Sequence, residues 1–308
     1  MSFGRALLAV CLLRAGSVGA HDYWLLPDPL RVAPGGRVAL SLWVGDDFVP
    51  DEARGWQPER TPRFVHLTAR STADLRALAT ADARPLVALP LAVSGGHLFA
   101  MERNVARIEL PAERFERYLR DEGLGAVVEA RRARGENAAP GRERYTRYLK
   151  AFAQVGGRRD DVSTRALGQT LELIPADDLA RVRPGQALRV AVHFRGAPLG
   201  GVLVEALSRV GDDVRRVGAV SDVHGAVTFA VDREGTWLLR AVHMARCEGC
   251  ADADWESWWT SYTFGVCAPR ERVCAAAPMT LRAASATTTP RAPIGAPTLA
   301  PRTGEPAP

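Results

Sequence analysis

Residues 37–44 read Arg-Val-Ala-Leu-Ser-Leu-Trp-Val, and residues 188–194 show the same alternation as Leu-Arg-Val-Ala-Val-His-Phe. Apolar side chains occupy every second position in both stretches, which is the period of a β-strand with one buried face. Polar turns such as Pro34-Gly35-Gly36 separate these stretches from their neighbours. Short strands spaced by turns predict a mainly β protein made of two immunoglobulin-like or transthyretin-like β-sandwich domains with a helical insertion.

The helical insertion is predicted from the region that follows Pro111, a residue favoured at helix starts. Phe115, Tyr118 and Leu119 lie at the i, i+3, i+4 spacing of one helix face, and the same spacing recurs over residues 145–152. We therefore divide the chain into a signal peptide, a β domain, the helical insertion, a second β-sandwich and a disordered tail rich in Pro, Ala and Thr. Their respective ranges are 1–20, 21–110, 111–160, 165–266 and 268–308.

Composition and charge exclude several classes of protein. The 308 residues are 47% hydrophobic and 24% charged, which are values of an ordinary globular chain. The net charge of +5 comes from 40 basic and 35 acidic residues, and the only lysine is Lys150. The basic residues form no dense tract, so nucleic acid is not an expected partner.

The first twenty residues have the pattern of a secretory signal peptide. Arg5 precedes a short apolar run, and Val18-Gly19-Ala20 supplies the small residues of a cleavage site. Cleavage after Ala20 predicts a periplasmic or secreted protein. No later apolar run is long enough for a transmembrane helix, so none is expected in the mature chain.

Cleavage at that point would make His21 the new N-terminus. An N-terminal histidine offers its α-amine and its Nδ1 to one metal, and a further imidazole would complete a site suited to Cu(II) or Ni(II). His243 is the best candidate for that imidazole, with Asp254 to orient or complete the site. The alternatives are a chance residue at position 21 and a structural histidine at position 243.

Four cysteines follow the signal peptide: Cys247, Cys250, Cys267 and Cys274. They allow three disulfide pairings, and disulfides are the expected state in an oxidising periplasm. Three alternatives stay open, namely a zinc site, a redox-active pair, and a Cu(I) site that also uses Met244.

Signatures of catalysis are missing from the sequence. It holds no Gly-x-Ser-x-Gly, His-Glu-x-x-His, phosphate-loop or Gly-x-Gly-x-x-Gly motif, so we expect no enzyme. Trp255, Trp258 and Trp259 could stack on a sugar or could close the core. A metal-free module that recognises an envelope polymer or a protein is therefore the alternative function, and an envelope hydrolase is a third class.

Several motifs in one order resemble the bacterial exported domain-of-unknown-function family 4198. They cover residues 21–266, beginning with His21-Asp22-Tyr23-Trp24-Leu25, and continue at 109–115, 141–145, 196–199, 235–239, 241–244 and 254–257. The family has carried the label of a periplasmic, NikM-like component of nickel or cobalt transport, and its second half resembles the carboxypeptidase-regulatory or transthyretin-like sandwich. Asp47 stands where relatives often carry histidine, which weakens a multi-histidine site in the first domain.

The resemblance and the position of His21 together favour a metal-binding or metal-uptake accessory protein. The expected cofactor is a divalent Cu, Ni or Co ion, held by His21, His243 and Asp254. The expected partner is a metal-uptake complex of the membrane or a component of the cell envelope.

Overall fold

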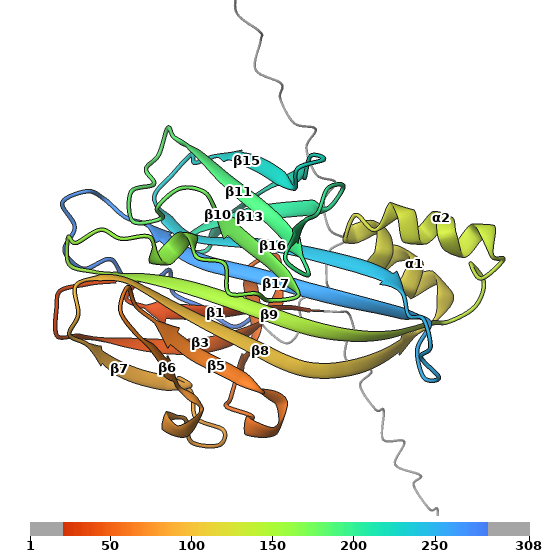
Figure 1. Ribbon diagram of the computed structural model, residues 1–308, viewed down its shortest axis with the longest axis horizontal. Coiled ribbons are helices and arrows are strands. Elements are labelled where there is room, and N and C mark those ends of the chain that lie inside the picture. The colour runs from red at the N-terminus through yellow and green to blue at the C-terminus, as the bar shows by residue number, and fades with distance from the viewer. Residues whose placement is uncertain (1–20, 283–308) are drawn as a thin grey trace, which may run out of the picture.

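The computed structural model describes residues 21–282, and these form a mainly β protein with two α-helices and three sheets (Figure 1). The predicted signal peptide lies outside the described residues. One small sheet contains β1 (Asp22–Asp28), β3 (Gly36–Asp46), β4 (Val49–Arg54) and β7 (Val87–Leu91). The other small sheet contains β10 (Leu171–Pro175), β11 (Ala187–Phe194), β12 (Ala197–Pro198) and β15 (Ala226–Ala230).

A long sheet lies between the two small ones and has the order β14-β13-β16-β17-β9-β8-β5-β6, with β2 also paired to β9 (Figure 1). Its strands are β2 (Arg31–Val32), β5 (Arg63–Leu67), β6 (Thr72–Asp74), β8 (Gly95–Leu110), β9 (Gly141–Val155), β13 (Leu203–Val210), β14 (Asp213–Val220), β16 (Gly235–Arg246) and β17 (Trp255–Val266). Short 3-10 helices span Pro58–Arg60 (η1), Arg76–Leu78 (η2) and Val162–Thr164 (η3).

Apolar side chains fill the space on both faces of the long sheet. On one face, Leu40 of β3 joins Phe99 of β8 and Leu149 of β9 in one buried cluster. On the other face, Leu188 of β11 and Leu239 of β16 belong to a second cluster. The alternation that predicted strands at 37–44 and 188–194 is thus confirmed, because each strand presents one face to the long sheet.

The two predicted β regions are joined through the long sheet. Strand β9 precedes the second region and pairs in parallel with β17 at its end, from Trp255 opposite Glu143 to Thr263 opposite Ala151. Strands of the first region, β8 and β5, continue the same sheet beyond β9. The boundary between the regions therefore runs along a continuous ladder of hydrogen bonds.

The prediction of helix was right for the first half of the insertion and wrong for the second half. Helices α1 (Ala112–Asp121) and α2 (Gly125–Ala133) bury Phe115 and Leu119 against the end of the long sheet, whereas residues 141–155 form strand β9. Phe152 packs on one face of the sheet and Leu149 on the other. A strand buried on both faces loses the alternation of apolar and polar residues, so its apolar positions matched a helical spacing by coincidence.

The prediction of a disordered tail is wrong for residues 268–282, which are docked on the body of the protein; residues 283–308 lie outside the described part. The backbone N–H of Cys274 donates to Arg31 O at 3.0 Å, and that of Ala277 donates to Thr236 Oγ1 at 2.7 Å. Polar anchors and the Cys267–Cys274 disulfide hold this segment where apolar burial alone would not. None of the described helices is long and apolar enough to cross a membrane.

Candidate functional site

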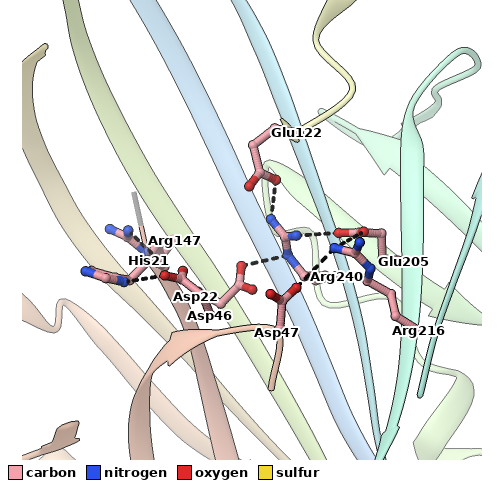
Figure 2. Close-up of polar contacts among 9 residues, drawn as sticks. All are labelled: His21, Asp22, Asp46, Asp47, Glu122, Arg147, Glu205, Arg216 and Arg240. Atoms are coloured by element: carbon pink, nitrogen blue, oxygen red, sulfur yellow. Dashed lines mark hydrogen bonds and ion pairs between the residues drawn. The ribbon is translucent and has the colours of Figure 1, made fainter. Parts of the chain in front are cut away.

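His21 lies beside two carboxylates, immediately before β1. Its Nδ1 donates a hydrogen bond to Asp46 Oδ2 at 3.0 Å and lies 3.8 Å from Asp51 Oδ2 (Figure 2 shows the first contact). One ligand atom from each of the three residues falls within 4.8 Å of the others. The three side chains are partly exposed, with side-chain exposures of 27%, 36% and 32% in the order His21, Asp46 and Asp51.

Strand pairing assembles this group, which we call the His21 cluster (His21, Asp46 and Asp51). Strand β1 pairs with β3 so that Asp22 lies opposite Gly45, which brings His21 next to Asp46. A two-residue turn, whose residues have φ values of 55° and 60°, reverses the chain between Asp46 and its partner Val49. Two successive positive φ values match the right-handed twist of a hairpin. The reversal brings Asp51 of β4 back beside His21.

Opposing effects set the charge of the His21 cluster. Burial raises the pKa of Asp46, but the hydrogen bond and charge of His21, with Arg240 and Arg282 further away, outweigh burial and leave that pKa below its usual value. Arg282 Nε also lies 3.3 Å from Asp51 Oδ1. Asp46 is therefore ionised at neutral pH, and the cluster offers one imidazole and two carboxylates to a cation.

A buried arginine anchors the strand that carries His21. Arg240 of β16 is 3% exposed, and its Nε lies 2.6 Å from Asp22 Oδ1 (Figure 2). It also pairs with Glu122 and Glu205. Burial lowers the pKa of Arg240, but the three carboxylates outweigh burial and raise the pKa well above its usual value. Arg240 therefore stays charged and ties β1 to the long sheet.

Asp47 points away from the His21 cluster. Its Oδ1 lies 3.0 Å from Arg216 Nη1, at the far side of the Arg240 network (Figure 2). Asp47 therefore belongs to the charge network around Arg240. It does not contribute a ligand atom to the His21 cluster.

The structure does not bring His243 to His21. Arg240 and Asp22 meet on the side of the long sheet that faces β1, whereas His243, three residues further along β16, contacts Phe194 of β11 with ring centroids 4.6 Å apart. Alternate side chains of a strand point to opposite faces, so the sheet separates the two histidines. Burial and the nearby Arg195 lower the pKa of His243, which is the behaviour of a neutral structural histidine.

Asp254 is likewise held elsewhere. Its carboxylate accepts two hydrogen bonds from Arg142, at 3.0 Å from Nε and 2.8 Å from Nη2. This bidentate pair lowers the pKa of Asp254 and links the residue before β17 to Arg142 of β9. The expected site of His21, His243 and Asp254 is therefore not formed, because β pairing places each of them in a different environment.

The four cysteines form two disulfides, Cys247–Cys250 and Cys267–Cys274. This is one of the three pairings that the sequence allowed. Both bonds occupy the sulfur atoms that a zinc or Cu(I) site would need, so those alternatives are not supported. The same holds for the cluster of Cys267, Glu271 and Cys274, whose potential ligand atoms lie within 4.8 Å of one another.

The three tryptophans of β17 close the core. Trp255, Trp258 and Trp259 are 3%, 5% and 4% exposed, so they offer no surface for stacking on a sugar. Trp258 stacks with His243, and Trp259 with Tyr118 of α1. The alternative of a metal-free envelope-binding module was based on these tryptophans, and they belong to the interior of the protein.

Sequence reasoning missed Asp46 and Asp51 as partners of His21. The acidic pair Asp46-Asp47 is visible in the sequence, but adjacent acids in turns are usually solvated. The usable signal was the two-residue spacing between a strand that ends at Asp46 and a strand that begins at Val49, since a tight hairpin returns the chain to the same edge.

Comparisons with known proteins agree with the resemblance in the sequence. The model of one protein family, described as Domain of unknown function (DUF4198), matches residues 18–245. No curated protein matches the chain.

Proposed function

This chain belongs to the DUF4198 family of domains of unknown function, and from that premise we propose that it is an exported protein that binds a divalent transition metal through the His21 cluster. Nickel, cobalt and copper are the candidate ions, because imidazole nitrogen combined with carboxylate oxygen suits this part of the first transition row. The protein would serve metal handling or uptake in the periplasm, with a membrane uptake complex as its partner. The proposal assigns no catalysis to the site.

The observation that carries the proposal is the convergence of three ligand atoms within 4.8 Å. They come from the residue before β1, the end of β3 and the start of β4, so the folded chain alone assembles them. Arg240 pins the adjacent Asp22, which limits the motion of His21. A site held by paired strands needs little reorganisation when an ion binds.

Signal-peptide cleavage after Ala20 would add a fourth donor. The α-amine of His21 would then be free and could close a chelate with the ring nitrogen. Nδ1 of His21, the nitrogen that such a chelate uses, is also the one directed at Asp46. The metal would replace the proton that now lies between these two atoms, so its affinity should fall at acid pH.

The test is a calorimetric titration of Ni(II), Co(II) and Cu(II) into protein whose N-terminus is confirmed as His21 by intact mass. We expect 1:1 binding that weakens at least tenfold in His21→Ala and in Asp46→Asn. The matched controls are His224→Ala and Asp232→Asn, which change exposed residues outside the cluster and should bind as the wild type does.

A further variant carries one additional residue before His21 and separates the two halves of the proposal. Weaker binding in this variant assigns the α-amine as a ligand, whereas unchanged binding assigns the site to the side chains of the cluster. No saturable binding by the wild type, or equal binding by the wild type, His21→Ala and Asp46→Asn, would overturn the proposal.

A further inference from the structure

A cleft of about 470 Å³ opens between β1, β4, η1, β8 and β9, and its lining is strongly basic. Five arginines line it, and no acidic residue does: Arg54, Arg60, Arg103, Arg107 and Arg147. Its volume is that of a site for a small organic molecule. We call it the arginine cleft.

Two of these arginines are buried and lie opposite one another on adjacent strands. Arg103 of β8 and Arg147 of β9 are direct partners in the strand register, and they are only 9% and 6% exposed. Like charges directly opposite one another destabilise a sheet, and burial increases that cost. Burial, together with Arg147 and other nearby arginines, lowers the pKa of Arg103.

No carboxylate of residues 21–282 forms an ion pair with Arg103 or Arg147. Arg103 donates to Gln57 Oε1 at 2.6 Å, and Arg147 donates to the backbone oxygen of His21 at 2.9 Å. The buried Nε of Arg147 has no hydrogen-bond partner in this part of the chain. Arg147 acts electrostatically on the buried Glu143, but neither guanidinium is in direct contact with a carboxylate of these residues, and a bound anion would supply that contact.

An aromatic ring orients the guanidinium groups without using their N–H donors. Tyr23 lies against Arg147, Arg103 and Arg54, with 4.2, 5.5 and 5.7 Å between each guanidinium carbon and the ring centroid. Stacked guanidinium groups keep their donor edges free for a ligand. Tyr145 covers Arg147 from another side at 4.4 Å.

A β-bulge shapes the mouth of the cleft. The register between β8 and β9 shifts between Arg103 and Ala106, and Asn104 inside the shift donates to Glu59 O at 2.7 Å. Bulges redirect side chains beside binding sites. This one joins β8 to η1, where the exposed Arg60 also has no ion pair within residues 21–282.

We propose that the arginine cleft binds a small organic anion that carries two or more carboxylate or phosphate groups. The planar forks of Arg103 and Arg147 match such groups bidentately, and Arg60 meets a further charge at the mouth. The ligand supplies the direct ion pairs that Arg103 and Arg147 do not form within residues 21–282. This binding does not require a metal, so it is separate from the function proposed for the His21 cluster.

The test uses protein freed of metal on a chelating resin and titrated with citrate, pyrophosphate and orthophosphate at low ionic strength. We expect citrate or pyrophosphate to bind at least tenfold more tightly than orthophosphate, because the cleft offers several separated charges. Citrate alone would identify carboxylates as the ligand chemistry, and pyrophosphate alone would identify phosphates. Absence of binding by both at 1 mM would overturn the proposal.

Variants assign the binding to the cleft. Arg103→Gln and Arg60→Gln should each weaken binding at least tenfold, and because Arg60 is exposed its variant is expected to fold normally. Arg215→Gln is the matched control, since this exposed arginine pairs with Asp232 outside the cleft. Binding that Arg60→Gln and Arg103→Gln leave unchanged, or that Arg215→Gln weakens equally, would show a non-specific effect of charge and would also overturn the proposal.

Discussion

Asp22 and Arg240 form a buried ion pair, 2.6 Å apart, that joins the first described strand to β16 near the end of the fold. Asp22 follows His21 directly, so the contact that secures β1 also positions the candidate metal ligand. In the motif His21-Asp22-Tyr23-Trp24, His21 belongs to the His21 cluster, Asp22 to the Arg240 charge network, Tyr23 to the arginine cleft and Trp24 to the core.

Replacing Arg240 by methionine should destabilise the protein strongly. The substitution leaves Asp22, Glu122 and Glu205 buried without their shared cation, and breaking a buried pair from one side typically costs about 3–5 kcal/mol. The free energy of unfolding in urea measures the loss. Arg215→Met is the control, because its partner Asp232 is exposed and such pairs contribute about 1 kcal/mol or less. Equal midpoints for the two variants would contradict this role of Arg240.

Glu143 should make stability fall as the pH rises. Burial raises its pKa from 4.5 to about 7, although hydrogen bonds from Ser257 and Tyr118 and the charge of Arg147 lower it. Between pH 4.5 and about 7 the folded state keeps a proton that the unfolded state releases, so the free energy of unfolding falls by about 3 kcal/mol over this window.

The variant Glu143→Gln imitates the protonated acid and removes that dependence. We expect it to match the wild type near pH 5 and to be more stable than the wild type at pH 8, as measured by urea unfolding at both pH values. Glu129→Gln on α2 is the control, since this side chain is 70% exposed and its effect should be the same at both pH values. A difference between Glu143→Gln and the wild type that does not vary with pH would refute the shift.

The Cys267–Cys274 disulfide should hold the C-terminal segment on the body of the protein. Peptide mapping without reduction is expected to find this bond and Cys247–Cys250. Replacing Cys267 and Cys274 by serine should cost about 2 kcal/mol of stability, as expected for a short loop. Exchange of the Ala277 amide, which is bonded to Thr236 Oγ1, should become faster. The control is the double replacement of Cys247 and Cys250, which should leave that amide protected. Any other pairing in the map would exclude this arrangement.

Local sequence was sufficient where one face of an element is buried. Residues 188–194 alternate because β11 covers one face of the long sheet, and Phe115 and Leu119 mark the buried side of α1. It was insufficient for residues 141–155, where β9 is buried on both faces between β8 and β17. Residues 147–155 are all buried, the polar Arg147, Lys150 and Gln154 included, so burial leaves no alternation in the sequence and only the neighbouring strands identify β9 as a strand.

The sequence by itself determined that the chain is mainly β, that His21 begins a distinctive motif, and that its cysteines suit disulfides. Tertiary structure alone decided which residues meet. The β1–β3 register and the hairpin at Asp47 place two carboxylates beside His21, while the long sheet keeps His243 on its other face. The pairing of β8 with β9 places Arg103 opposite Arg147. Periodicity along a strand reports which face is buried, but register depends on contacts between distant segments, so the partners at a site emerge only in the folded chain.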